Sequence, residues 1–265
     1  SVLVAAAVMF RSAEVALWAF ALNAWIRVFV ATVLLVPWLR HDKKPKHSSW
    51  RRDLSTILAV AAPATISAAL GAPVITFLYA SMNRGGGGTL DAAAFGVTFQ
   101  IFTLLMVVPS IVTQYSLPRL SRAVNATAEH SALRVALRFS TASLSVSVVA
   151  TLPFIIWPSE ALGLLSSSYT AFDATLVVMC IAAIATAPQG VFSNLLLANG
   201  SAWARVVPKF LWAVTVIGIM SIPLGATAYH AAMAYLGGAI ILLLTQTTLS
   251  VTLSRRSEKS AGQGS

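Results

Sequence analysis

Residues 54–83 read LSTILAVAAPATISAALGAPVITFLYASMN and contain no Lys, Arg, Asp or Glu. A helix that crosses a bilayer needs roughly 20 consecutive, mostly apolar residues. A helix on the surface of a soluble protein would carry a polar face at every turn instead. Residues 92–118 and 231–253 are free of charge in the same way. These stretches predict membrane-spanning helices, because none shows the roughly ten-residue alternation of a barrel strand.

The composition of the whole chain agrees with a membrane protein. Of its 265 residues, 57% are hydrophobic and 10% are charged, and the mean hydropathy is +0.80. A soluble domain carries about 25% charged residues. The net charge of +10 is also seen in nucleic-acid-binding proteins, but here the basic residues gather at the ends of apolar stretches. We therefore expect membrane lipid, and no nucleic acid, as a partner.

The apolar stretches predict an all-α fold, a polytopic bundle of transmembrane helices. An apolar stub at 1–10 lacks the basic start of a signal peptide, so we expect it to end a helix that begins upstream. Complete spans are predicted at 15–38, 54–80, 92–116, 139–157, 174–197, 210–228 and 231–253.

The basic residues predict the orientation of these spans. Most of the 18 lie in alternate connections: 40–53 (RHDKKPKHSSWRRD), 119–138, the pair Arg205 and Lys209, and the tail 254–265. Because Lys and Arg are enriched in cytoplasmic loops, we place these segments in the cytoplasm. The expected location is the cell inner (cytoplasmic) membrane, with several passes and a cytoplasmic C-terminus.

No motif indicates an enzyme. A Gly-rich loop followed by Lys-Ser/Thr is missing, and the four histidines have no metal-ligand spacing. The single Cys180 provides neither a disulfide nor a metal site. We expect no catalytic residue, no metal and no cofactor.

Prolines interrupt two neighbouring spans: Pro63 and Pro73 in the first, Pro109 and Pro118 in the second. Each removes a backbone donor and can kink its helix. Such breaks recur in transporters where helices move or line a cavity, so these four are predicted conformational hinges. The alternative is ordinary tolerance, since proline is commoner in membrane helices than in soluble ones.

Polar side chains inside the spans are the candidate substrate contacts. Arg27 lies in the middle of span 15–38 with no nearby acidic residue, where a charge is costly unless it faces a cavity or a partner. A carboxamide in hydrocarbon also needs a partner, so interhelical bonding is the alternative role. The predicted substrate-binding residues are Arg27, Gln100, Gln114, Gln189 and Asn194, while Tyr115 and Gln246 are further polar residues within spans.

Several short motifs follow one another in a recognisable order. They are AAFG at 93–96, Pro109 with LPRLS at 117–121, Gly163 before Tyr169, LLANG at 196–200 and GATAYHAAMAY at 225–235. In this order the chain resembles the multidrug/oligosaccharidyl-lipid/polysaccharide exporter superfamily, and within it the polysaccharide (O-antigen type) flippases.

The resemblance implies two lobes of six helices with both termini in the cytoplasm. On that plan 1–39 holds the last helices of a truncated N-terminal lobe, and 40–53 is a basic cytoplasmic linker. Residues 54–253 form the six-helix C-terminal lobe, and 254–265 are a cytoplasmic tail. The chain would thus hold one six-helix lobe plus the end of the preceding lobe.

The resemblance also implies a function, the transport of a lipid-linked oligosaccharide or polysaccharide precursor by alternating access. A coupling ion, H⁺ or Na⁺, is left open as a further partner. Two alternatives stay open: a drug/cation antiporter of the same superfamily, and a non-transporting membrane scaffold subunit. The antiporter would need a carboxylate inside the membrane, and every acidic residue lies at or beyond a predicted span end.

Overall fold

The computed structural model describes residues 50–84, 88–125, 129–222 and 225–262. The chain divides into two units, 1–55 and 56–265. Arg27, the predicted span 15–38 and most of the predicted linker lie outside the described residues.

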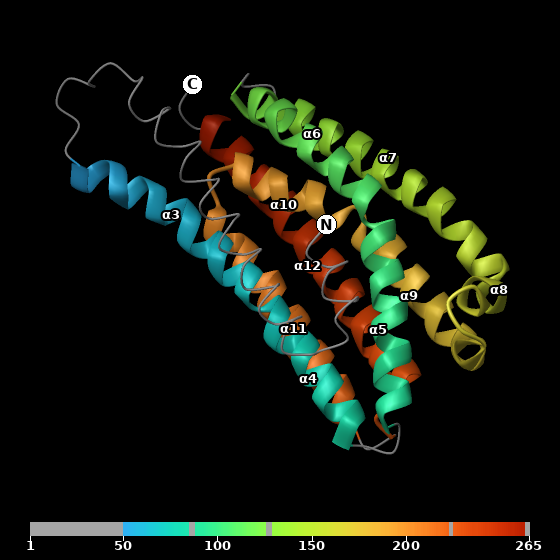
Figure 1. Cartoon of the computed structure of the whole chain (residues 1–265). Coiled ribbons are helices and arrows are strands. Elements are labelled where there is room, and N and C mark those ends of the chain that lie inside the picture. Colours follow the sequence, from blue (N-terminus) through green and yellow to red (C-terminus); the bar gives the residue numbers. More distant parts are fainter. Residues whose placement is uncertain (1–49, 85–87, 126–128, 223–224, 263–265) are drawn as a thin grey trace. The chain divides into compact units, whose positions relative to one another are not determined.

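Within the described ranges every regular element is helical and there is no β-strand. Short 3₁₀ helices separate some of the longer α-helices (Figure 1). In chain order the elements are α3 (Trp50–Ala69), α4 (Gly71–Arg84), α5 (Gly88–Leu105), α6 (Val107–Asn125), α7 (Glu129–Ile156), α8 (Pro158–Gly163), η1 (Ser167–Phe172), α9 (Asp173–Thr186), α10 (Gln189–Ala198), η2 (Ala202–Arg205), α11 (Val206–Met220) and α12 (Ala228–Gly262).

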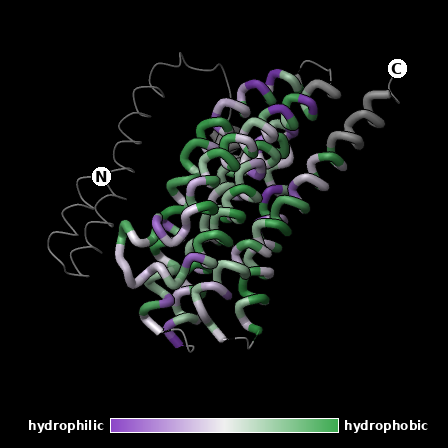
Figure 2. The backbone as a smooth tube through the Cα atoms, turned by 90° about the vertical axis from the view of Figure 1, so that its right-hand side faces the viewer, coloured by the Kyte–Doolittle hydropathy of each residue, from purple (hydrophilic) through white to green (hydrophobic). Residues whose placement is uncertain are grey.

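Among the described residues, six helical segments are long and apolar enough to cross a membrane. Figure 2 shows hydrophobic residues along the length of the helices and the more hydrophilic ones mainly towards their ends. The chain is therefore a multi-pass membrane protein, and the predicted all-α transmembrane fold is confirmed. The segments are Ala61–Arg84, Gly88–Leu105, Ala132–Ile156, Ser167–Ala198, Ala202–Met220 and Ala228–Leu253.

In two spans the helix ends four residues before a proline, at the residue whose carbonyl would have accepted a hydrogen bond from that position. A proline cannot donate to the carbonyl four residues earlier, and its ring clashes with that carbonyl. Pro73 stands four residues after Ala69, where α3 ends, and Pro109 stands four residues after Leu105, where α5 ends. The ribbon changes direction between α5 and α6 (Figure 1). Local chemistry thus accounts for both breaks.

The remaining prolines behave differently. Pro63 lies inside α3 and Pro118 inside α6, and both helices continue through them. Pro188 falls between α9 and α10, where Ala187 and Pro188 form a turn. The hinge roles of Pro63, Pro73, Pro109 and Pro118 stay predictions.

Several predicted boundaries were wrong, because charged residues end the apolar stretch without ending the helix. The connection predicted at 119–138 is mostly helical, since α6 runs to Asn125 and α7 begins at Glu129. The span predicted at 210–228 is α11, which begins at Val206, before the charged Lys209. It ends at Met220, earlier than predicted, and the turn residues Pro223 and Gly225 follow in the sequence. By contrast, α12 continues to Gly262, beyond the predicted end at 253.

The main core lies where α12 packs against α9 and α11. Small residues on α12 permit a close approach: a Cβ on Gly238 would lie 2.5 Å from Cγ2 of Val216 on α11. Tyr235 on α12 makes edge-to-face contacts with Phe102 and Trp212, at centroid distances of 5.2 and 5.9 Å. Aromatic pairs of this kind add packing energy to the buried area, so α5, α11 and α12 are held together at one level.

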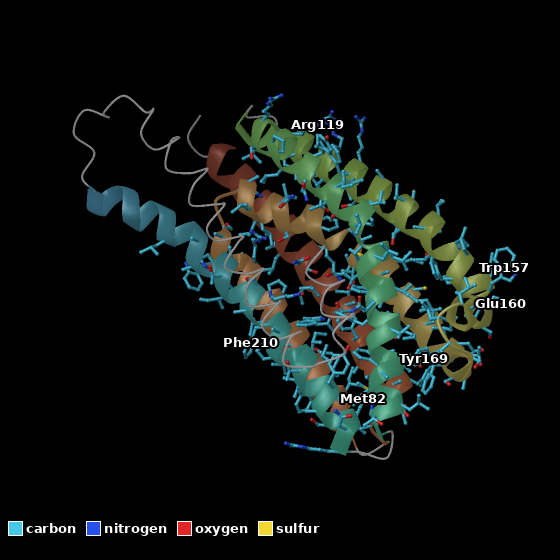
Figure 3. The ribbon with its side chains drawn as sticks, viewed as in Figure 1. Met82, Arg119, Trp157, Glu160, Tyr169 and Phe210 are labelled. Atoms are coloured by element: carbon cyan, nitrogen blue, oxygen red, sulfur yellow. The ribbon has the colours of Figure 1, made fainter. Side chains whose placement is uncertain are left out.

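The two ends of the bundle differ in charge. Figure 1 shows the end of α6 and the start of α7 at one end of the bundle, and the end of α4 and the start of α5 at the opposite end. Arg119 and Arg122 lie near the end of α6, whereas α4 ends with Arg84 and the first turn of α5 holds Asp91, so that their charges cancel. Figure 3 shows Arg119 at the first end and Trp157 at the other. This difference between the two ends agrees with the alternation of basic and nearly uncharged connections along the sequence.

Candidate functional site

A cavity of about 530 Å³ lies where the three broken spans meet. Its wall includes Ala68 just before the α3–α4 break, Met106 at the α5–α6 break and Ala187 at the α9–α10 break. Irregular backbone at membrane depth is tolerated where protein or a water-filled cavity satisfies it. The remaining lining residues are Ala64, Ser67, Ser110, Thr113, Gln114, Thr186, Gln189, Gly190, Ser193, Arg205, Lys209, Leu242 and Gln246.

Two basic side chains give this cavity its charge. Arg205 closes η2 and Lys209 stands four residues later on α11, so both occupy one face, one helical turn apart. Nε of Arg205 donates a hydrogen bond of 2.7 Å to Oγ of Ser193 on α10. Nζ of Lys209 lies 4.2 Å from the ring centroid of Trp212. These contacts hold both side chains at the wall.

No acidic residue lines the cavity. A cleft lined by one sign of charge between low-dielectric walls attracts ions of the opposite sign. Within the part of the chain that the structure describes, no group of three His, Cys, Asp or Glu residues could hold a metal ion. The arrangement suits an anion rather than a cation.

Gln246 on α12 contributes a polar group with an unused acceptor. Its side chain is only 6% exposed and lines the cavity, and its Oε1 accepts no hydrogen bond from any described residue. A buried acceptor without a donor costs about 1–3 kcal/mol. An N–H or O–H group that entered the cavity could satisfy this oxygen.

Gln114 and Gln189, both predicted substrate contacts, line the same cavity. Gln114 on α6 is exposed. Gln189 is 5% exposed, and its Nε2 donates to the backbone carbonyls of Ala185 at 3.2 Å and Ala239 at 2.8 Å. The Gln189 amide therefore already joins α10 to α12, which is the alternative role considered for such residues.

The other predicted contacts are placed elsewhere. Nδ2 of Asn194 donates to the carbonyl of Thr113 at 2.8 Å and to Oγ of Ser116 at 3.1 Å, joining α10 to α6. Gln100 is exposed on α5 and does not line this cavity. Arg27 lies outside the described residues.

Sequence reasoning missed Arg205 and Lys209 as site residues. It used them only as basic residues that orient the spans; the structure places both in the helical segment Ala202–Met220, at the wall of the cavity. The available signal was their four-residue spacing, followed by Trp212 one turn later on the same helical face. Only the packing of α10 against η2 and of α11 against α12 shows that this face lines a cavity.

No protein-family model matches the chain, and no curated protein or solved structure matches it at a significant level. The resemblance to the exporter superfamily stays a prediction.

Proposed function

We propose that this chain belongs to a flippase, a transporter that moves a lipid-linked oligosaccharide or polysaccharide precursor across the cell inner membrane by alternating access. The observation that carries the proposal is the cationic cavity at the level where three spans are interrupted. The resemblance to the polysaccharide flippases of the multidrug/oligosaccharidyl-lipid/polysaccharide exporter superfamily supports it.

The charge of the cavity favours an anionic cargo. A lipid-linked saccharide carries a phosphate or diphosphate between its lipid tail and its sugar. A guanidinium matches phosphate with a planar fork of donors, and an ammonium adds a point charge. Arg205 and Lys209 would take the phosphate, and Gln246 would accept a hydrogen bond from a sugar hydroxyl.

The broken helices favour a transporter over a scaffold. An assembly subunit needs only straight helices with complementary faces. Here α3–α4, α5–α6 and α9–α10 are each interrupted next to the same cavity, and discontinuous helices around a central site are typical of secondary transporters. Small rotations at these breaks would change access to the cavity without bond chemistry, so no enzymatic step is proposed.

The same cavity disfavours the drug/cation antiporter. Exchange of a cationic drug for H⁺ or Na⁺ needs a carboxylate at the site, and none lines this cavity. Asp91, on α5, accepts a 2.7 Å hydrogen bond from the backbone N–H of Ala228 at the start of α12, away from the cavity wall. The coupling ion of the proposed transporter stays open.

The test is a flipping assay on the complete protein in proteoliposomes that contain a fluorescent polyprenyl-diphosphate sugar. Arg205→Gln and Lys209→Gln should each slow transfer of the sugar to the opposite leaflet by roughly tenfold or more, the size expected for a lost charge-assisted hydrogen bond. Arg84→Gln is the matched control, since Arg84 is exposed in the last turn of α4 at the other end of the bundle.

Full flipping activity in a folded double variant Arg205→Gln/Lys209→Gln would overturn the assignment of the cavity. Transport of a cationic dye by the parental protein, without transport of the lipid-linked sugar, would favour the antiporter. Transport of neither would favour the scaffold.

A further inference from the structure

A second cavity of about 240 Å³ lies on the outer face of the α6–α7 pair. Its lining consists of Arg119 from α6 and Val135, Arg138, Phe139 and Ala142 from α7. The sequence neighbour of Arg119, Leu120, is buried in the core between α6, α7 and α10. Because successive helical residues point in different directions, the exposed Arg119 and Arg138 face away from that core.

The apolar part of this cavity lies on one face of α7. Val135, Phe139 and Ala142 are four and three residues apart, which places them in a row along the helix. The guanidinium of Arg119 lies over the Phe139 ring, 5.5 Å from its centroid, so a cation–π contact orients it across the helix pair. None of the residues in the wall is acidic.

The cavity lies near the beginning of the apolar segment of α7, where we expect lipid headgroups. The apolar segment of α7 begins at Ala132, so Arg138 stands about 9 Å into it at the helical rise per residue. A long basic side chain at that depth reaches the headgroup level, while its stem stays among apolar groups. Arg119 belongs to the second half of α6, six residues before that helix ends at Asn125. Charge therefore lies at the membrane boundary, and apolar surface continues towards the bilayer interior.

We propose that this cavity binds an anionic phospholipid of the protein's own membrane. The phosphate would lie between the guanidinium groups of Arg119 and Arg138, and the first acyl methylenes would lie on Val135 and Ala142. Basic pockets between transmembrane helices at one membrane surface are suited to anionic headgroups. Arg122, exposed one turn beyond Arg119, adds positive charge that disfavours a zwitterionic headgroup with a terminal ammonium.

This site is separate from the proposed transport cavity, because the two share no lining residue. Loss of lipid binding at α6–α7 would leave the flippase proposal intact. Loss of flipping in the Arg205 and Lys209 variants would likewise leave the lipid site intact.

The test is native mass spectrometry of the delipidated complete protein, titrated with phosphatidylglycerol or with phosphatidylcholine of identical acyl chains. We expect phosphatidylglycerol to bind more tightly. The double variant Arg119→Gln/Arg138→Gln should weaken its binding about thirty-fold, since each basic residue near an anionic surface contributes roughly a factor of five. Arg84→Gln, at the opposite end of the bundle, should bind the lipid as the parental protein does.

A second variant keeps both arginines but fills the cavity between α6 and α7. Ala142→Trp fills the cavity from its exposed outer side and should also abolish the preference for phosphatidylglycerol. If the double arginine variant fails to fold, Ala142→Trp decides the question. Unchanged phosphatidylglycerol binding in either folded variant overturns the proposal. So does equal binding of the two lipids, or displacement of the lipid by millimolar inorganic phosphate, which would indicate a simple phosphate site.

Discussion

The side-chain amide of Gln189 donates a 2.8 Å hydrogen bond to the backbone carbonyl of Ala239, linking the start of α10 to α12. The same nitrogen also donates to the carbonyl of Ala185, at 3.2 Å, across the α9–α10 break. One amide nitrogen of Gln189 therefore links the start of α10 both to α9, across the break, and to α12. Because Gln189 also lines the cavity, these hydrogen bonds hold the cavity wall in place.

Gln189→Leu should lower the stability of the folded bundle by about 0.6 kcal/mol, the mean measured for interhelical hydrogen bonds in a membrane, and by no more than about 1.7 kcal/mol. Unfolding of the complete protein in detergent, followed by circular dichroism during heating, measures the change. Loss of flipping at unchanged stability would instead return Gln189 to the group of substrate contacts.

Gln246→Leu is expected to act in the opposite way. The substitution removes a buried oxygen that has no hydrogen-bond partner among the described residues, so stability should stay equal or rise. Flipping should fall, because the sugar would lose an acceptor. Thermal unfolding and the proteoliposome assay, run on the same preparation, separate the two effects. A less stable protein that transports normally would show that Gln246 serves packing alone.

Gly190→Ala should destabilise the contact between α10 and α6. A Cβ on Gly190 would lie 2.6 Å from Cγ2 and 2.7 Å from Oγ1 of Thr113, and overpacking of a tight contact costs about 1–3 kcal/mol. Thr113→Ala removes both of these atoms, so the double variant should recover much of the loss. A double-mutant cycle by thermal unfolding measures this coupling, and independent, additive effects would contradict the close packing.

The orientation of the spans can be tested by cysteine labelling. Cys180 is buried and is first replaced by Ala. A cysteine at Gly87, in the connection between α4 and α5, should react with an impermeant thiol reagent added outside cells. A cysteine at Ser48, in the basic segment before α3, should not, because basic connections stay in the cytoplasm. The reverse pattern would invert the topology.

The helices were predictable to different degrees. Apolar length alone indicated most of the spans, and the donor missing from Pro73 and Pro109 is a local property that explains why α3 ends at Ala69 and α5 at Leu105. The missing donor does not end the helix at Pro118, since α6 continues through it. A local rule identifies where a helix is weakened, and the neighbouring packing decides whether it breaks.

Helix ends at the membrane surface were less predictable. Arg134 and Arg138 precede the apolar stretch predicted at 139–157, yet α7 already begins at Glu129. Backbone hydrogen bonding continues in water as well as in lipid, so a charge marks the boundary of the membrane and not that of the helix.

The sequence by itself determined that this is an all-helical membrane protein, because burying uncharged stretches of this length in lipid leaves the backbone no other way to satisfy its hydrogen bonds. It could not determine which polar residues share a cavity. Gln189 and Asn194 looked like equivalent carboxamides, and Arg205 and Lys209 looked like loop charges. Only the packing of α10 against α6, η2 and α12 made Asn194 a hydrogen-bond link between helices and brought Arg205 and Lys209 to one wall. Contacts between residues far apart in the chain depend on how whole helices approach each other, and no local pattern encodes that approach.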